Sequence, residues 1–379
     1  MLCGYTKLSS IMNDITQAGL LFNAAYIPYD YFMKLCTDYD PSEAFAGMDF
    51  WKELALTDAQ CLRLSDILAK DGWIARELDI LERLGGRFIT AKDIDYPAKL
   101  CDLKRPPVGL YVKGKVNLSL PSAAIVGTRK PSSYGQNTAV NLARALARHG
   151  VMTISGGARG IDSAAHRGSL QDGGITIAVF GTSIDKVYPT ENRDLFERIT
   201  ERGAIVSEYP IGCPGESWHF PERNRLIAAM SSRVVIVEAG DKSGALITAG
   251  YAEELGRELW AVPGRITDET CRGTNSLITR GAKCLYDVGE FVEKFTGRHE
   301  QLELFGDDTE ESKDEISPAM ELGDDEKVIY SLLQKKGKVT LDELIADSKL
   351  GAVEVQSALI MLQAEGLVSE ATGRYSAVN

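Results

Sequence analysis

Residues 122–162 read SAAIVGTRKPSSYGQNTAVNLARALARHGVMTISGGARGID, and this stretch decides the fold class. The small and β-branched run Ala123 to Val126 predicts a strand, and Gln136 to Arg148 has the apolar spacing of a helix. Val151 to Ile154 predicts a second strand, and a glycine-containing turn follows each strand. This order is typical of a parallel sheet whose two faces are covered by helices.

The same alternation continues through residue 286. It predicts an α/β domain over residues 122–297, with a doubly wound, Rossmann-like, mostly parallel sheet. Ligands of such sheets bind beyond the carboxyl ends of the strands. Further strands are expected at Thr176–Phe180, Ala204–Ser207, Val234–Glu238, Leu259–Val262 and Lys283–Tyr286, and further helices at Ile161–Gln171, Glu222–Met230 and Ala245–Gly256.

Two segments precede this core. Helical stretches at Asp58 to Lys70 and Ala75 to Leu84, without a strong strand pattern, predict an N-terminal helical (SAM-like) domain over residues 1–86. Residues 87–121 contain Arg105-Pro106-Pro107, which disfavours helix, and are expected to form an extended connector leading into the core.

The formal net charge of −12 is concentrated in one segment. Residues 300–326 hold twelve acidic residues and one base, Lys313, so the other 352 residues sum to about −1. High charge with little apolar content predicts an acidic linker over residues 298–326. It is either a solvated spacer or a tail that mimics nucleic acid over a basic groove.

Residues 327–379 are expected to form a winged-helix-like domain. Three helices precede a hairpin that turns at Thr372-Gly373. The third helix has no Lys or Arg, which favours contact with a protein over reading of duplex DNA, although both remain open. The three helices are expected at Glu326–Gln334, Thr340–Ser348 and Ala352–Glu365.

The composition is that of a cytoplasmic protein. No signal peptide opens the chain, and no apolar stretch approaches the ~18 residues that a membrane span needs. The seven cysteines are scattered and form no Cys-x-x-Cys pair, so we expect them to be reduced and expect no metal site.

The turn after the first strand is a candidate anion site. Gly127 permits a tight turn, Thr128 and the amides near the next helix can meet an anion, and Arg129 presents a planar guanidinium suited to phosphate. A plain turn with a solvated arginine explains this loop equally well when it is taken alone.

The turn after the second strand adds backbone amides. Gly156, Gly157 and Gly160 allow close approach of a phosphate, Ser155 offers a hydroxyl and Arg159 a charge. The alternative is a close strand-to-helix crossover that needs small residues.

Asp162 and His166 lie four residues apart on one helical face. The spacing fits acid/base chemistry. A carboxylate at the start of a helix and a histidine with satisfied hydrogen bonds are favoured instead, because the sequence shows no nucleophile and no third residue of a catalytic set. We therefore expect no catalytic residue and no enzyme activity.

The loops after the later strands repeat the pattern of small residues plus a base. Tyr188 and Trp218 to Phe220 add aromatic rings suited to unpaired bases. Arg223 or Arg225 has an alternative role, pairing with Glu222 or Glu238 to hold its loop. The further candidate DNA-binding residues are Lys186, Arg193, Arg223, Asn224, Arg225, Lys242, Ser243 and Gly244.

Residues from about 87 to 296 resemble the DNA-processing protein DprA (Smf) family. The resemblance implies a homodimer without cofactor that binds single-stranded DNA and loads the recombinase RecA in natural transformation, with a single-strand-binding protein as a further partner. The motifs that carry it are AIVGTR (124–129), SGGARGIDSAAH (155–166), YP (188–189), SEYP (207–210), FPERNR (220–225), SGALIT (243–248), AVPG (261–264) and GTNSLI (273–278).

The resemblance carries DNA contacts over to Arg129, Ser155, Gly156 and Arg159. Thr190 stands where some members have a lysine, and Lys186 or Arg193 would substitute for it. The alternative is a nucleotide-binding enzyme of the phosphoribohydrolase-like Rossmann type, although the chain lacks a P-loop and the dinucleotide glycine spacing.

Overall fold

The structure is a computed structural model and describes residues 14–296, 323–337, 339–348, 350–364, 367–371 and 374–377. Contacts divide the chain into two compact units, and the boundary along the sequence lies between residues 301 and 302. The expected acidic linker lies outside the described residues as far as residue 322, and so does the expected turn at Thr372-Gly373. No described helix is long and apolar enough to cross a membrane.

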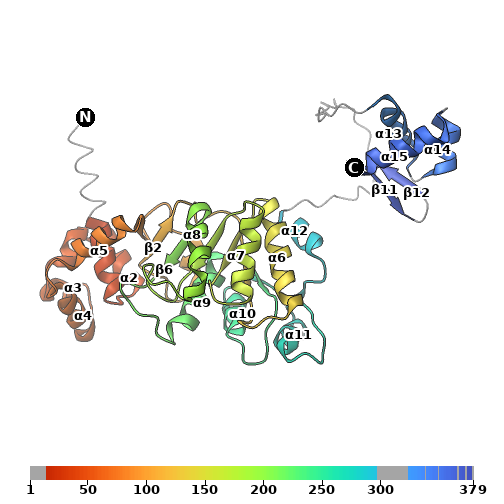
Figure 1. The fold of residues 1–379 in the computed structure, drawn as a ribbon. Coiled ribbons are helices and arrows are strands. Elements are labelled where there is room, and N and C mark those ends of the chain that lie inside the picture. Colours follow the sequence, from red (N-terminus) through yellow and green to blue (C-terminus); the bar gives the residue numbers. More distant parts are fainter. Residues whose placement is uncertain are drawn as a thin grey trace, which may run out of the picture. The chain divides into compact units, whose positions relative to one another are not determined.

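A nine-stranded sheet forms the centre of the first unit (Figure 1). Its strand order is β1-β2-β6-β5-β4-β3-β7-β8-β9, and all neighbours from β6 to β9 are parallel. This confirms the doubly wound sheet. Each of the seven expected strands is present, and its bounds differ from the expected ones by at most two residues. The strands are β1 Gly86–Thr90, β2 Gly109–Gly114, β3 Ser122–Val126, β4 Met152–Ser155, β5 Thr176–Val179, β6 Ala204–Ser207, β7 Arg233–Ile236, β8 Glu258–Ala261 and β9 Lys283–Cys284.

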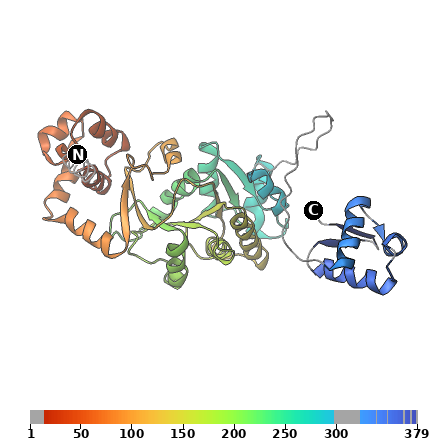
Figure 2. The same ribbon diagram turned by 90° about the horizontal axis from the view of Figure 1, so that it is seen from above.

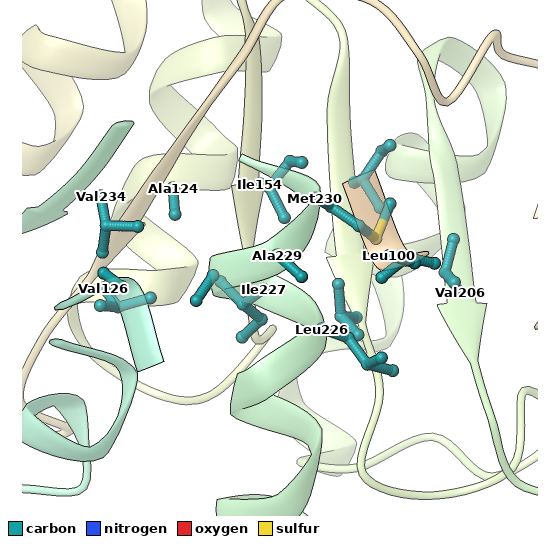
Figure 3. Packing of buried hydrophobic residues seen from close by; sticks show 14 of the residues in the cluster. Leu100, Ala124, Val126, Ile154, Val206, Leu226, Ile227, Ala229, Met230 and Val234 are labelled. Carbon is teal, nitrogen blue, oxygen red and sulfur yellow. The ribbon is translucent and has the colours of Figure 1, made fainter. Parts of the chain in front are cut away.

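Helices cover both faces of the sheet because successive strand residues point to opposite sides. Ala123 and Ile125 pack with one helical layer, whereas Ala124 and Val126 pack with the other. Figure 3 shows this second cluster, in which Leu226 and Ile227 lie over the strands. One layer holds α6 Ser133–Arg148, α7 Ile161–Gln171, α8 Arg193–Arg202 and α12 Val288–Thr296, and the other holds α9 His219–Met230, α10 Ala245–Glu254 and α11 Arg272–Thr279.

Residues 87–121 were expected to be an extended connector, but residues 87–90 and 109–114 are strands of the sheet. β1 and β2 form an antiparallel pair, and Tyr111 of β2 pairs with Ser207 of β6. Leu110 and Val112 are fully buried on one face and Tyr111 on the other. Burial on both faces stabilises these strands, although prolines interrupt the intervening loop. A short 3₁₀ helix, η2 Ala98–Asp102, occupies that loop.

The N-terminal helices are present as expected, but they share a core with the sheet. Leu20 and Leu81 are buried in the same cluster as Phe180 and Phe196. Figure 2 shows these helices, coloured red to orange, at the end of the sheet formed by β1 and β2. The elements are a helix over 14–24, α2 Tyr29–Asp38, η1 Pro41–Phe45, α3 Met48–Glu53, α4 Asp58–Leu68 and α5 Trp73–Arg83.

The second unit has the winged-helix arrangement that its sequence predicts. Three helices enclose a small core around Leu333 and Leu359, and a three-stranded sheet of order β10-β12-β11 closes it. The short strand β10 was not expected. The elements are α13 Asp324–Lys336, β10 Val339–Thr340, α14 Leu341–Ser348, α15 Ala352–Ala364, β11 Val368–Ala371 and β12 Arg374–Ala377.

The order of strands fixes where a ligand can bind. β4, β5 and β6 extend from β3 in one direction, and β7 and β8 extend in the other. The two connections that leave β3 and β7 therefore diverge and open a crevice at the carboxyl edge of the sheet. Two short 3₁₀ helices lie in loops that follow strands of the parallel sheet. η3 Thr190–Asn192 lies between β5 and α8, and η4 Glu269–Cys271 lies between β8 and α11.

Candidate functional site

A cleft of about 920 Å³ opens at this crevice, and we call it the carboxyl-edge cleft. It lies between the loop after β3 and the N-terminus of α10, and it brings together candidates that are more than 100 residues apart in the chain. The expected residues that line it are Gly127, Thr128, Arg129, Arg223, Asn224, Lys242, Ser243 and Gly244.

A smaller adjoining cleft shares Arg129 and Phe220 with the first. Gly156 and Arg159 line it together with the exposed ring of Tyr188. Since Arg129 and Phe220 belong to both clefts, the two form one continuous concave surface. The loops after β3, β4 and β5 all contribute to it.

The Arg129 loop is held by backbone contacts on both sides. The Thr128 amide donates to the Glu238 carbonyl at 2.7 Å, and the Ile161 amide donates to the Thr128 carbonyl at 3.2 Å. The buried Glu238 carboxylate also accepts from the amide and hydroxyl of Ser132, at 3.0 and 2.9 Å. These bonds fix the backbone, so the exposed Arg129 side chain starts from a defined position.

Aromatic rings lie beside this guanidinium. The Arg129 Cζ atom is 5.9 Å from the centroid of the Phe220 ring, within range of a cation–π contact. The rings of Phe220 and Tyr188 are 5.4 Å apart. A flat cation next to two accessible rings offers one surface for a phosphate and one for a base.

The cleft holds cations that the fold does not neutralise. Arg129, Lys130 and Lys242 are exposed, and none of them makes an ion pair with the part of the chain that the structure describes. Arg272 lies 4.0 Å from Glu269 at the rim. Arg159 pairs with Glu191, and both side chains are about half exposed, so an anionic ligand can compete for this guanidinium.

Arg223 is a buried structural cation beneath the cleft. Its guanidinium donates to the carbonyl of Gly156 at 2.8 Å and to that of Val179. Burial lowers the pKa of Arg223 to about 10, although the nearby Asp162 carboxylate opposes that change. Arg223 therefore ties β4 and β5 together at the floor of both clefts, and its direct contact with DNA stays a prediction.

Arg225 is also withdrawn from solvent. It pairs with Glu208 and with Glu222, the second contact measuring 3.1 Å. Its side chain is 8% exposed, so it cannot meet a ligand without breaking both pairs. The alternative of pairing with Glu222 is confirmed, and a DNA contact of Arg225 stays a prediction that requires both pairs to open. Asn224, one residue earlier, does reach the cleft and donates to the Gly244 carbonyl.

Five other candidates line neither cleft, namely Ser155, Gly157, Gly160, Lys186 and Arg193. The buried Ser155 hydroxyl donates to the Ile125 carbonyl at 2.6 Å, and Gly157 packs against the ring of Phe196. Lys186 pairs with Asp185 at 3.5 Å on the surface, and Arg193 begins α8 outside both clefts. Ser155 is thus a structural residue, because its hydroxyl is already used inside the sheet.

Gly160 supports the crossover interpretation of the second turn. Its φ of +78° lies in the region that favours glycine, and an added Cβ would be 2.3 Å from the Thr128 carbonyl oxygen. The absence of a side chain lets the β4 turn pass against the Arg129 loop. Gly160 therefore shapes the site through packing.

Replacing Gly160 by alanine should destabilise the fold by roughly 3 kcal/mol, because backbone strain and a backbone clash add. Gly150→Ala is the matched control, since φ is also positive at +69° but nothing lies within 4 Å of the added Cβ. We expect it to cost only about 1 kcal/mol. Urea unfolding of both variants checks this, and equal losses would contradict the packing role.

Asp162 and His166 are both buried in the core, but His166 is not fully satisfied as expected, because its Nε2 atom has no hydrogen-bond partner among the described residues. The Asp162 carboxylate accepts from the Ala158 amide at 3.3 Å, and burial raises its pKa although Arg223 opposes the shift. His166 is fully buried and its Nδ1 lies 2.7 Å from the Thr176 hydroxyl oxygen. Burial lowers the pKa of His166 to about 3, so the ring is neutral at physiological pH.

This buried histidine should make folding acid-sensitive. The unfolded state binds a proton near pH 6.5 and the folded state only near 3, so stability falls as pH falls through that window. The expected slope approaches 1.4 kcal/mol per pH unit. His166→Asn retains a polar atom near Thr176 but cannot titrate. Unfolding at pH 7 and pH 5 should therefore differ less in the variant than in the native chain.

Some residues of the site were not predicted. Lys130 follows Arg129 directly, and Arg272 begins α11 after the loop that leaves β8. Loops that follow parallel strands converge at one edge of the sheet, and the loop after β8 is one of them. This rule therefore also predicts Arg272 as a site residue. Phe220 was noted only as one ring among several, and its place between the two clefts depends on tertiary structure.

Comparisons with known proteins agree with this architecture. A family model described as "DNA recombination-mediator protein A" matches residues 87–296, and one described as "DprA winged helix domain" matches residues 313–374. A putative DNA processing protein DprA of Mycobacterium tuberculosis is 36% identical over 318 residues, which cover 79% of this chain and 79% of that protein. Protein Smf of Synechocystis is 34% identical, covering 76% and 79%.

Two solved structures are similar as well. The X-ray structure of DNA processing protein A from Streptococcus pneumoniae has 30% identity and a TM-score of 0.63, covering 75% of this chain and 96% of that one. A structure of DNA processing protein A from Helicobacter pylori has 34% identity and a TM-score of 0.51, covering 56% and 96%. The Helicobacter protein has a single-stranded DNA binding mode that is described as unique.

Proposed function

The chain belongs to the DNA recombination-mediator protein A (DprA) family, and from that premise we propose that it binds single-stranded DNA along its two adjoining clefts. The observation that carries the proposal is the set of unneutralised cations Arg129, Lys130 and Lys242 in the larger cleft, together with the Phe220 ring beside Arg129 and the Tyr188 ring next to it. Cations and accessible rings together suit a strand whose bases are unpaired.

We assign each group a role in binding. Arg129 and Lys130 neutralise backbone phosphates at the loop after β3, and Lys242 does so at the N-terminus of α10. The positive end of the helix dipole favours an anion there further. Phe220 and Tyr188 offer stacking surfaces for bases. Arg159 exchanges Glu191 for a phosphate when DNA enters the smaller cleft.

The proposed activity is binding without catalysis. Asp162 and His166 are the candidate acid and base that the sequence offered, and both are engaged in the core, where burial disfavours the charged form of each. We further propose that the protein acts in the cytoplasm as a homodimer that protects incoming DNA. On this view it loads a RecA-type recombinase during natural transformation or recombination, with a single-strand-binding protein as a further partner. Membership of the recombination-mediator family supports this wider role.

Fluorescence anisotropy of the full chain with a labelled oligo(dT) strand and a labelled hairpin duplex tests the proposal. Tighter binding to the single strand is expected, with log K falling linearly as log salt rises. Three or four neutralised phosphates should give a slope of roughly −2 to −3. Equal affinity for both DNAs, or binding that ignores salt, would refute it. Micromolar binding of ATP, NAD or nucleoside monophosphates in calorimetry would instead favour a nucleotide-handling enzyme.

A further inference from the structure

The N-terminal helices make two buried contacts with the segment that follows β6. The Asn23 side-chain amide, on the helix over 14–24, donates to the Glu208 carbonyl at 2.8 Å. Glu77 on α5 accepts from the Ile211 amide at 2.8 Å. Glu77 is 4% exposed and Asn23 is 6% exposed, so water cannot readily replace either partner.

These two contacts bracket Tyr209, whose ring leads to the clefts. The ring stacks on that of His219, with centroids 4.0 Å apart and planes 24° apart, and its hydroxyl lies 3.4 Å from the His219 carbonyl oxygen. His219 directly precedes Phe220, the residue shared by both clefts. A continuous chain of contacts therefore runs from α5 to the aromatic edge of the binding surface.

The same segment has other anchors on the sheet and on α9. The Tyr209 amide donates to the Ser207 hydroxyl at 3.0 Å, and the Glu208 carboxylate pairs with Arg225. The Gly212 amide donates to Asp185 at 3.0 Å, and the Ser183 hydroxyl donates to the Cys213 carbonyl at 3.1 Å. These bonds hold residues 212–213, beyond Tyr209. Asn23 and Glu77 add anchors from the N-terminal helices on either side of Tyr209, and Leu20 and Leu81 fix those helices in the common core.

We propose that Asn23 and Glu77 are positioning residues for DNA binding and that the N-terminal helices hold the Phe220 edge of the clefts in a conformation ready to stack on bases. This inference rests on the proposed function. It gives the N-terminal helices a role in binding although they lie outside the residues matched by the recombination-mediator family model. Preorganisation of this kind raises affinity because less loop order is lost on binding.

Three substitutions around one oxygen atom separate positioning from general stability. Glu77 Oε1 accepts both from Ile211 and from the Tyr111 hydroxyl, each at 2.8 Å. Glu77→Leu removes both bonds, and Glu77→Gln retains an oxygen that accepts both. Tyr111→Phe removes a hydroxyl that contacts Glu77 and Asn23 but makes no bond to the loop. Thermal melts of the three variants monitor stability.

We expect Glu77→Leu to weaken oligo(dT) binding roughly fivefold, because binding then has to order the loop. Glu77→Gln and Tyr111→Phe should bind within twofold of the native chain. Hydrogen exchange across residues 208–220 of the free protein should be faster in Glu77→Leu alone. If Glu77→Leu fails to fold, Asn23→Ala replaces it. This substitution releases Glu208, on the other side of Tyr209, and should likewise give faster exchange and weaker binding.

The inference would be overturned if hydrogen exchange and DNA affinity were unchanged in Glu77→Leu, or in Asn23→Ala where Glu77→Leu does not fold. An equal loss of affinity in Tyr111→Phe would overturn it as well. Failure of the native chain to bind oligo(dT) would instead refute the proposed function. In that case the exchange measurement still decides whether the N-terminal helices hold the loop.

Discussion

Replacement of Arg129 by glutamate is expected to weaken single-stranded DNA binding by roughly ten- to a hundredfold at moderate salt, because a charge-assisted bond to phosphate is lost and a repulsion is gained. The side chain is exposed and lines both clefts, whereas Arg223, which also lines both, is buried. Stability should change little, since the guanidinium makes no ion pair with the described residues.

Salt titration sharpens this prediction. Loss of one phosphate contact should make the slope of log K against log salt less steep by about 0.7 for a single strand. Arg198→Glu is the matched control, because Arg198 is an exposed arginine on α8 that lines neither cleft and the formal charge change is identical. If the two variants lose equal affinity, only net charge matters and the assignment of the cleft is wrong.

Replacement of Arg223 by methionine is expected to destabilise the fold by roughly 3 to 5 kcal/mol. The substitution leaves the carbonyls of Gly156 and Val179 without their donor and leaves the buried Asp162 without its nearby cation. Both turns that form the smaller cleft depend on these contacts, so DNA binding should fall with stability. Urea unfolding at pH 7 measures the effect.

A second substitution identifies the source of that loss. Arg223→Met combined with Asp162→Asn should recover part of the stability, because the stranded carboxylate is gone. The single variant should also be less impaired in acid. Its Asp162 has a folded-state pKa raised by burial, so the cost of ionisation disappears as pH falls below the unfolded-state value near 4. A double variant no more stable than the single one would show that the hydrogen bonds alone matter.

The parallel core was predictable from sequence because local signals agreed there. The helix predicted at Ile161–Gln171 has those bounds in the structure, since Gly160 ends the preceding turn and the apolar spacing ends at Gln171. The strands β1 and β2 were missed for a physical reason. Their place is set by pairing with β6, almost a hundred residues away, and the segment between them contains helix-breaking prolines.

The candidate site was predictable as a set of loops but not residue by residue. Arg129 follows a glycine by two residues and Arg223 follows a phenylalanine by three. The neighbouring sequence does not show which of the two side chains is exposed. Arg223 is buried because the fold brings the carbonyls of Gly156 and Val179 to its guanidinium. Which arginine meets solvent is decided by contacts between distant strands, and only the tertiary structure supplies them.

The antiparallel pairing of β2 with β6 also constrains the order in which the chain can fold during synthesis. Residues of β2 leave the ribosome about 100 residues before their partners on β6, a delay of roughly 5 to 20 s at ordinary elongation rates. During that interval the emerging N-terminal half has an unpaired strand edge, which is a risk for aggregation. Pairing becomes possible when Ser207 emerges, and Tyr209 and its neighbours follow within a few residues. The edge is therefore covered at the same stage of synthesis at which the loop beside the clefts is completed.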